Sequence, residues 1–441
     1  AQMSLVKTFN LPISDIGRTK AQLSAKILGA VQQDHNDEFE IEFPDTLRIE
    51  RYTEVLNWYK NPLNRDYSKS LEIDVAGVPH VFAWGGLHGA IPKYFGEGWY
   101  VNVDVASYYP SLMLRYGWIS RNVADPAKYD EIYHTRLKLK AEKNPMQQPY
   151  KIVLNSTYGA MKDRHNAMYD PRQANNVCVG GQLLLLDLIE RLEDHCDIIQ
   201  SNTDGILIKL RRYEDFDLID DICWEWEERT GMRLEFDEFQ KVFQKDVNNY
   251  LIVPAGPLRD EKGKPRWKCK GAYVKKLSDL DYDLPIVNRA IISFFLYGTK
   301  PEETIGACDS LRDFQKVVKV SSKYKYALYS PVITMEKIRD EKGRSKTVKK
   351  FRGGEVQTDK TFRVFASKDH TKGGLFKVSG KTVKGRQKNP EQFANTPEHC
   401  FFINDDVTAL PVPDELDKQY YIDTAWSRLQ DFGVEREGGG I

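Results

Sequence analysis

Several features that mark particular protein classes are scarce in this sequence. Cysteine occurs six times in 441 residues, and no two cysteines form a CxxC pair, so neither a zinc site nor a disulfide framework is expected. No run of about 18 apolar residues occurs, which predicts no membrane span and no membrane partner. The first ten residues lack the basic and apolar regions of a secretory signal. These absences predict a cytoplasmic protein with reduced thiols.

Net charge is absent as well, because 64 basic residues balance 64 acidic ones. A polyanion responds to local patches and not to the average charge, so this balance excludes no partner. The distribution is uneven, since residues 316–388 hold 21 Lys and Arg against 6 Asp and Glu. This excess predicts salt-dependent contacts with nucleic acid phosphates. The aromatic residues interleaved there fit a core, or less commonly a platform for stacked bases; they are Tyr324, Tyr326, Phe351 and Phe365.

The length of the chain predicts two to four lobes, because one hydrophobic core rarely serves 441 residues. Alternating apolar residues predict a short strand at 38–43 and a hairpin over 71–83. Helical periodicity predicts helices over 129–142 and 150–161, joined by a turn that contains proline. The sequence therefore indicates a chain that mixes helices with strands.

Two aspartates lie where predicted strands end. Asp104 ends a strand at 100–105, and Asp204 lies in the turn of a strand–turn–strand at 197–210. If these strands are neighbours, both carboxylates meet at one edge of a sheet. Mg²⁺ prefers such oxygen ligands, and a site for two ions needs carboxylates with open metal positions. Taken singly, each aspartate fits a turn or helix-capping role better.

Four short patterns place these aspartates in a characteristic order. Residues 104–111 read DVASYYPS, residues 151–159 read KIVLNSTYG, residues 201–205 read SNTDG, and residues 84–86 read WGG. The first three resemble motifs A, B and C of family B DNA polymerases, and the fourth resembles the YxGG element that precedes them. Among members of that family, the chain is most similar to phage-encoded forms. The likeness covers about half of the sequence, residues 80–295.

The resemblance implies an α+β fold with the right-hand polymerase architecture, in which a palm with an antiparallel sheet carries short helical fingers and a basic thumb. Residues 1–99 would form an N-terminal bracing region with the hairpin before the palm. The palm would comprise 100–120 and 161–290, and the fingers 121–160. Residues 291–441 would form the thumb and the C-terminal region.

The resemblance also implies an activity, that of a DNA-directed DNA polymerase. Such an enzyme adds deoxynucleotides to a primer 3′ end with two Mg²⁺ ions, for which Mn²⁺ can substitute. Asp104 and Asp204 would bind the ions, assisted by the Val105 carbonyl. The residues that would contact the nucleotide are Ser107, Tyr108, Tyr109, Arg136, Lys140, Lys151 and Asn155. Those that would contact primer–template DNA are Tyr158, Gly159, Thr203, Tyr250, Lys268 and Lys270.

The roles implied for the nucleotide site divide between backbone and side chains. Ser107 and Tyr108 would offer backbone N–H groups to the triphosphate, and Tyr109 would pack under the sugar and exclude a 2′-hydroxyl. Arg136 and Lys140 lie four residues apart and therefore share a helical face. With Lys151 and Asn155 on a facing helix, they would form a cationic clamp. Without the second pattern beside them, a solvated helix face is the simpler interpretation.

Some positions depart from the family pattern. Asn202 stands where motif C usually has its first aspartate, and Gly205 stands where a serine is usual. The second aspartate is the one expected to bridge the ions, so activity should survive with weaker metal occupancy. Downstream, residues 248–250 and 268–271 resemble the KKRY and KxKG elements that bind the primer duplex, and of the first only the tyrosine is kept.

Other segments known from this family are not expected here. Only 83 residues precede the WGG pattern, which predicts no proofreading exonuclease in this chain and suggests a separate exonuclease or accessory partner. The carboxylates of residues 71–74, LEID, sit in the predicted hairpin and are interpreted as structural. The gaps between the motifs span 47 and 45 positions, too short for the insertions of protein-primed relatives, so strand displacement should be weak.

Two rival interpretations remain beside the DNA polymerase. One is another palm-type polymerase, such as a reverse transcriptase or an RNA polymerase, which ribonucleotide incorporation would reveal. The other is a non-catalytic DNA-binding subunit of a replication complex, which would bind DNA without extending it. A phage origin would place the protein in the cytoplasm of a bacterial host.

Overall fold

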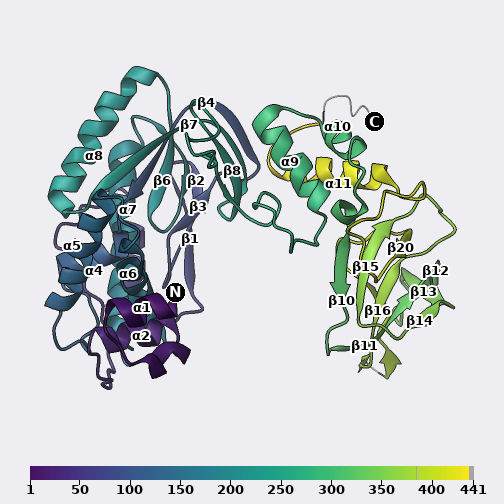
Figure 1. Cartoon of the computed structure of the whole chain (residues 1–441), viewed down its shortest axis with the longest axis horizontal. Coiled ribbons are helices and arrows are strands. Elements are labelled where there is room, and N and C mark those ends of the chain that lie inside the picture. Colours follow the sequence, from purple (N-terminus) through teal and green to yellow (C-terminus); the bar gives the residue numbers. More distant parts are fainter. Residues whose placement is uncertain (384, 437–441) are drawn as a thin grey trace. The chain divides into compact units, whose positions relative to one another are not determined.

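The structure is a computed structural model that describes residues 1–383 and 385–436. Its chain divides into two compact units (Figure 1). The first consists of Ala1–Pro92, Gly96–Lys241 and Pro254–Gly256, and the second of Lys93–Phe95, Val242–Val253 and the residues from Pro257 onward. Each unit mixes helices with antiparallel sheets, as the sequence predicts. The assignment to palm, fingers and thumb stays a prediction.

The sheet of the first unit has the strand order β1-β2-β3-β5-β6-β4-β7. The bounds are β1 Ser70–Val75, β2 Val78–Ala83, β3 His88–Ala90, β4 Tyr94–Val105, β5 Asp197–Ser201, β6 Gly205–Leu210 and β7 Leu234–Asp246, which continues into the second unit. The edge strand β1 alternates between exposed and more buried residues, whereas the interior strand β6 is buried along most of its length. A strand covered on both faces needs a continuous apolar run, which residues 206–208 provide.

The predicted hairpin over 71–83 is present as β1 and β2. Its turn is held by the Asp74 carboxylate, which accepts a hydrogen bond of 3.0 Å from the Gly77 N–H. The carboxylates of residues 71–74 therefore belong to a hairpin, in line with the structural interpretation.

Helix α7, Pro171–Leu192, is the buried centre of the first unit. It begins at Pro171, because proline is well suited to the first helical position. It packs against α4 Tyr108–Tyr116, α6 Gln147–Lys162 and α8 Phe216–Thr230, and α5 Ala127–Ala141 packs on α6. Helix α3, Thr53–Lys60, is joined to α7 by a hydrogen bond from Tyr59 to Gln182. The helices predicted at 129–142 and 150–161 correspond to α5 and α6.

The strand predicted at 38–43 is wrong, and the reason lies in α7. Residues 38–52 form a strap with turns at 38–39 and 45–46, and side chains of α7, instead of a neighbouring strand, hydrogen-bond its backbone. Asn175 donates to the Glu38 carbonyl over 2.8 Å. The buried Glu190 carboxylate accepts from three consecutive N–H groups at distances of 2.8–2.9 Å, those of Glu50, Arg51 and Tyr52. Because α7 satisfies these groups, the strap needs no ladder.

The N-terminal helices brace α6. They are α1, Gln2–Thr8, and α2, Lys20–Ile27. Thr19 and Gln22 form a capping box at the start of α2. The hydroxyls of Ser24 and Ser156 lie 2.9 Å apart, which joins α2 to α6. Phe9 meets Tyr150 edge to face at 5.2 Å between ring centroids. The N-terminal region therefore supports the helix that carries the KIVLNSTYG pattern.

An ion network joins Asp37, directly before the strap, to Asp170, directly before α7. Arg121 donates to both carboxylate oxygens of Asp37 at 2.8 and 2.9 Å, and to the buried Asp170 at 2.8 Å. The hydrogen bonds from Arg121 lower the pKa of Asp37 to about 2. A carboxylate whose pKa is lower when folded contributes stability above its unfolded pKa, and that stability is lost as pH falls toward 2.

The second unit joins a helical part to short sheets. Its helices are α9 Pro285–Tyr297, α10 Pro301–Gly306 and α11 Lys418–Asp431, and they share a core with Phe314 and Phe432. The strand orders are β10-β15-β20 and β14-β11-β16-β19, while β12 pairs with β13, β17 with β18, and β8 with β9. The bounds are β8 Asn249–Pro254, β9 Lys268–Lys270, β10 Lys316–Lys319, β11 Tyr324–Tyr329, β12 Val332–Arg339, β13 Ser345–Arg352, β14 Glu355–Gln357, β15 Thr361–Ala366, β16 Leu375–Ser379, β17 Thr382–Val383, β18 Arg386–Gln387, β19 Glu391–Gln392 and β20 Cys400–Phe402.

Among the aromatics of the basic stretch, Phe365 is fully buried in the core of the second unit. Tyr324 is half-buried and donates to Glu391 over 2.8 Å. The core interpretation therefore holds for Phe365. All six cysteines are free, as the spacing predicts. In the described part of the chain, no helix has the length and apolar character that a membrane crossing requires.

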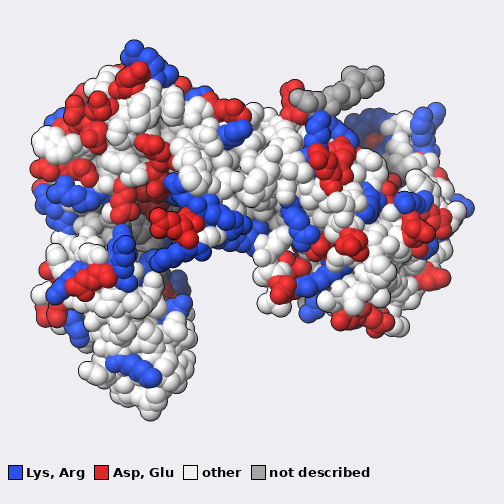
Figure 2. All heavy atoms as spheres, turned by 45° about the horizontal axis from the view of Figure 1, so that its top comes forward, with Lys and Arg blue, Asp and Glu red and all other residues white. Residues whose placement is uncertain are grey.

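Charge is distributed by element. Acidic and basic side chains gather in separate groups on the face seen in Figure 2. Helix α8 carries six acidic residues against the single basic Arg229, whereas residues 332–352 carry eight basic residues against three acidic ones. The neutral total of the chain is therefore the sum of strongly charged elements of opposite sign.

Candidate active site

The two candidate aspartates meet at one edge of the first unit's sheet. Strands β4 and β6 are antiparallel neighbours, with Asp104 opposite Gly205 in the register. The Val105 N–H donates to the Asp204 carbonyl over 2.7 Å, which fixes the end of β4 against the turn before β6. Asp104 is half-buried and Asp204 is exposed. The strands are thus neighbours, which is the condition for a shared carboxylate site.

Gly205 leaves the space in which the Asp104 carboxylate lies. A Cβ atom at position 205 would be under 3.0 Å from the Asp104 Oδ1 atom, a distance that real Cβ atoms almost never show. The other carboxylate oxygen, Oδ2, accepts a hydrogen bond of 2.7 Å from Asn102. The glycine at this departure from the family pattern therefore has a steric cause, since any side chain would displace Asp104.

Asn202 shapes the turn that carries Asp204. Its side-chain oxygen accepts from the Asp204 N–H over 3.2 Å, and its own N–H donates to the Gly205 carbonyl over 3.0 Å. Behind the turn, His80 contacts the Ser201 hydroxyl. An aspartate at 202 could accept the same hydrogen bond, so the turn geometry does not require the amide.

The WGG pattern packs directly against this turn. A Cβ atom at Gly86 would lie under 3.0 Å from the Thr203 hydroxyl, so only glycine allows this approach. Gln182 of α7 donates to the Gly85 carbonyl over 2.6 Å, and Lys162 of α6 donates to the Trp84 carbonyl over 3.3 Å. The pattern therefore links the aspartate edge to both helices.

The start of α4 lies beside the aspartates and connects them to α5. Ser107, at the N-cap, has a φ of 49°, in the left-handed region. Its hydroxyl accepts a hydrogen bond of 2.8 Å from Arg136. The first N–H groups of a helix have no acceptor within it and attract anions. The side chain of Tyr108 is committed to the core, where it donates to the Gly181 carbonyl over 2.6 Å.

Arg136 and Lys140 share a face of α5 but differ in surroundings. Arg136 is only 9% exposed, and its Nε atom has no hydrogen-bond partner. A buried, unsatisfied guanidinium N–H is costly, and an anionic ligand would satisfy it. Lys140 is about half exposed and forms an ion pair of 3.2 Å with Glu235 of β7. Its predicted place in the clamp would require this pair to open.

Helix α6 presents the polar residues of its pattern on one exposed face. Lys151, Asn155 and Gly159 follow each other at intervals of four and are all exposed. Gly159 has no packing reason to be glycine, since a Cβ there meets nothing within 4 Å, although glycine in a helix interior costs about 1 kcal/mol relative to alanine. Open space above a helical glycine is consistent with the close approach of a ligand.

The rings of Tyr109 and Tyr158 join the first and second patterns. Their centroids lie 4.6 Å apart in an edge-to-face arrangement. Burial raises the pKa of Tyr109, so the phenol stays neutral at physiological pH. A neutral ring held edge to face beside the aspartates is positioned to limit the size of a bound sugar.

The remaining predicted DNA-contacting residues form their own group in the second unit. Tyr250 of β8 is the register partner of Lys270 of β9, and Lys268 stands opposite Ile252. Arg428 of α11, which no sequence pattern singles out, is 6% exposed, and its guanidinium lies 4.1 Å from the centre of the Tyr273 ring. Burial lowers the pKa of Arg428. No sequence motif predicts the contact between Arg428 and Tyr273, because it depends on tertiary packing alone.

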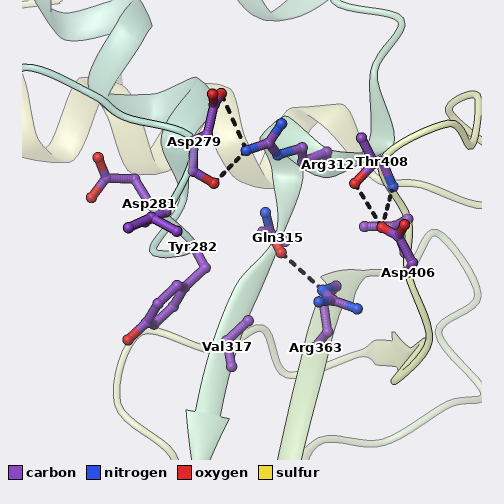
Figure 3. A pocket seen from close by; sticks show the side chains of 11 residues that line it. Asp279, Asp281, Tyr282, Arg312, Gln315, Val317, Arg363, Asp406 and Thr408 are labelled. Atoms are coloured by element: carbon purple, nitrogen blue, oxygen red, sulfur yellow. Dashed lines mark hydrogen bonds and ion pairs between the residues drawn. The ribbon is translucent and has the colours of Figure 1, made fainter.

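A cavity of about 720 Å³ in the second unit is a weaker candidate (Figure 3). Its two guanidinium groups already have partners, because Arg312 donates to Asp279 and Arg363 donates to Gln315 over 2.8 Å. Because both guanidinium groups are already hydrogen-bonded, they are poorly available to an anionic ligand.

The donor set at the aspartate edge suits a hard divalent cation. Within residues 1–383 and 385–436, no group of three or more His, Cys, Asp and Glu side chains could hold a metal ion by itself. Two carboxylates at one edge, one of them exposed, leave coordination positions open for substrate oxygens, which is the arrangement that Mg²⁺ sites for phosphates commonly use. The residues present therefore fit Mg²⁺.

Comparison with known proteins gives little beyond this geometry. No protein-family model matches the chain, and no curated protein matches it. Among solved structures, it is similar to the family B DNA polymerase from the hyperthermophilic archaeon Pyrobaculum calidifontis, with 14% sequence identity and a TM-score of 0.47. The match covers 100% of this chain and 54% of that one, so the chain spans about half the length of that polymerase. So distant a likeness assigns no function by itself.

Proposed function

We propose that this chain is a DNA-directed DNA polymerase that adds deoxynucleotides to the 3′ end of a primer. The observation that carries the proposal is the meeting of Asp104 and Asp204 at the β4–β6 edge, with Gly205 leaving room for the carboxylate. The motif order and the exposed polar face of α6 support it. The architecture would be that of palm, fingers and thumb, and the family type phage-like family B.

The side chains of the first unit would divide the work of nucleotide binding. Arg136 and the N–H groups at the start of α4 would bind the triphosphate, with Lys151 as a further cation. Asn155 would face the nascent base pair. Tyr109 would pack below the sugar and exclude a 2′-hydroxyl. Catalysis would then depend on positioning and charge neutralisation, without a covalent intermediate.

Asp104 and Asp204 would hold two Mg²⁺ ions through their carboxylate oxygens, assisted by the Val105 carbonyl, and Mn²⁺ would be accepted in their place. When bound, such ions activate the attacking 3′ oxygen and stabilise the leaving pyrophosphate. Asp104 is kept in position by its hydrogen bond from Asn102.

The partners that follow are primer–template DNA and deoxynucleoside triphosphates. Tyr158, Gly159 and Thr203 would contact DNA near the aspartates. Tyr250, Lys268 and Lys270 would contact the duplex, where alternating lysines on a strand can follow a phosphate backbone. For a phage-encoded protein, the site of action would be the cytoplasm of a bacterial host.

The test is primer extension with Mg²⁺ and deoxynucleotides, comparing the chain with Asp104→Ala and Asp204→Ala. Each substitution should lower the extension rate by about 10³-fold or more, because transition-state charge loses its metal ions. Asp217→Ala, on the exposed face of α8, serves as the matched control and should extend normally. A wild-type chain that binds primer–template but never extends it would refute the proposal in favour of a non-catalytic DNA-binding subunit.

Ribonucleotides separate the proposal from other palm-type polymerases. The wild-type chain should prefer deoxynucleotides, and Tyr109→Ala should raise relative ribonucleotide incorporation by about 10–100-fold, since a hydroxyl that no longer clashes is poorly rejected. The control is Tyr213→Ala, at an exposed position. Tyr116 is not used as a control because its hydroxyl contacts Thr46. Equal use of both nucleotides by the wild type would favour an RNA polymerase.

A further inference from the structure

Strands β12 and β13 form an antiparallel hairpin, here called the basic ribbon, which comprises residues 332–352 (Figure 1). In the described part of the chain, neither strand pairs with any other. Most ribbon residues are exposed, and only Glu336, Asp340, Val348 and Phe351 are half-buried. An isolated hairpin is marginally stable in water. The ribbon has no core of its own, so its residues are better explained by a function of its surface.

The ribbon carries eight basic residues against three acidic ones. Three of the basic residues are neutralised locally, since Lys350 and Arg352 pair with Glu336, and Arg344 pairs with Asp340. Five form no ion pair or side-chain hydrogen bond with any described residue; they are Lys337, Arg339, Lys342, Lys346 and Lys349. Like charges on so short a hairpin repel each other, so an anionic partner would relieve this repulsion.

The register places these cations on both faces. Lys337 stands opposite Thr347, and Lys349 opposite Met335, on one face. Lys346 stands opposite Ile338 on the other face, because neighbouring residues of a strand point to opposite sides. Lys342 lies in the turn. The ribbon is therefore positive on both faces and at its tip, which suits a partner with phosphates on both sides of it.

Both ends of the ribbon have a defined geometry. At the tip, the Asp340 carboxylate accepts from the N–H groups of Lys342 and Arg344 at 2.9 and 2.8 Å. At the base, Gly354 has a φ of 97°, and a Cβ there would press on Leu328 and Pro331 at 3.1 Å. The apolar residues gather at this end, beside a cavity of about 790 Å³ that Ile333, Met335, Phe351 and Phe376 help to line.

We propose that the basic ribbon binds duplex DNA by lying in the major groove, with its lysines toward the phosphates of both walls. That groove is about 12 Å wide and admits a two-stranded ribbon. Eight residues per strand give a length of about 26 Å at roughly 3.3 Å per residue. Lysine acts as a point charge and does not read bases bidentately, so binding would be independent of sequence. The inference rests on the proposed function for the choice of DNA as the nucleic acid.

The first experiment measures the affinity for a short blunt DNA duplex as a function of salt, without nucleotide or Mg²⁺. The ribbon variant replaces Lys337, Lys342, Lys346 and Lys349 by Gln. Its log–log salt slope should fall by about 3–4, at about 0.9 for each phosphate that is no longer neutralised, and its affinity near 0.15 M salt by about 10²–10³-fold. The matched control replaces four other exposed lysines by Gln and should keep the slope; they are Lys7, Lys20, Lys128 and Lys143.

The second experiment locates the groove. Duplexes whose pyrimidines carry bulky groups at C5 have an obstructed major groove, and the wild type should bind them about 10-fold more weakly, at a cost of about 1.4 kcal/mol. The ribbon variant should not distinguish them from plain duplex. Double-stranded RNA should bind weakly too, because its major groove is deep and narrow. An unchanged salt slope in the ribbon variant would overturn the proposal, and so would indifference of the wild type to the C5 groups.

Failure of this inference can be told from failure of the proposed function. A ribbon variant that extends primers and keeps its salt slope would refute the ribbon alone. A wild-type chain that shows the ribbon-dependent slope but never extends a primer would refute the polymerase alone.

Discussion

The aspartate edge of the first unit and the basic ribbon of the second use charge in opposite ways. At the edge, a main-chain hydrogen bond joins the ends of the two strands, the Asn102 amide holds the Asp104 carboxylate, and the missing Cβ of Gly205 leaves room for that carboxylate. On the ribbon, cations project from an exposed hairpin and have little packing around them. The first arrangement depends on the position of single atoms, and the second on a sum of charges. A single substitution at the edge should therefore remove most of the primer extension, whereas each substitution on the ribbon should weaken DNA binding by a small factor.

The largest effect expected from a small change is at Gly205. Gly205→Ala should lower primer extension by about 10²-fold, because a carboxylate moved by roughly 1 Å loses its catalytic alignment. The control is Gly17→Ala, at an exposed position outside the site where a new Cβ meets nothing within 4 Å, and it should extend normally. Full activity of Gly205→Ala would show that the edge tolerates displacement and would break the comparison.

Arg136 should show the next largest effect. Arg136→Ala should raise the KM for deoxynucleotides by about 10-fold with a smaller change in kcat, since a charge-assisted contact to the triphosphate is worth about 1.4 kcal/mol or more. Lys138→Ala, exposed on the same helix, is the control. Steady-state kinetics measures both. A fall in kcat without a change in KM would instead indicate that Arg136 acts by positioning Ser107.

A single ribbon lysine should matter less. Lys346→Gln should weaken duplex binding near 0.15 M salt by about fivefold, the contribution of one released counterion. Adding the other lysine substitutions one at a time should multiply this factor. Fluorescence anisotropy follows each step. A single substitution that alone removed binding would show that the ribbon, like the edge, depends on one precise contact.

The smallest effect is expected at Asn202. Asn202→Asp should lower the Mg²⁺ concentration for half-maximal extension by about twofold to threefold, because a nearby carboxylate strengthens a hard-cation site. The turn should be kept, since aspartate can accept the same hydrogen bond from the Asp204 N–H. A higher Mg²⁺ requirement would contradict the metal site as proposed.

Sequence patterns predicted the aspartate edge better than they predicted its surroundings. The strands that carry Asp104 and Asp204 could be predicted because buried strands and turn residues leave clear local signals. Their pairing was only a condition of the prediction, and the register of β4 and β6 meets it. The strand predicted at 38–43 is wrong because its hydrogen-bond partners are side chains of α7, more than 100 residues away. The link between Arg136 and Ser107 was equally beyond local patterns. Contacts of this kind depend on tertiary packing, which alternation and periodicity do not encode.

The strap over α7 has a consequence for the order in which the first unit assembles. Its partners on the helix, from Asn175 to Glu190, come into line only once α7 is helical. The strap precedes α7 in the chain, so it emerges first during synthesis and must wait for its partner. A shift by one residue would separate the buried carboxylates of Asp187 and Glu190 from the N–H groups of the strap that donate to them. Residues 38–52 should thus dock late and in a single alignment, which makes them a poor place for an insertion or for a new chain end.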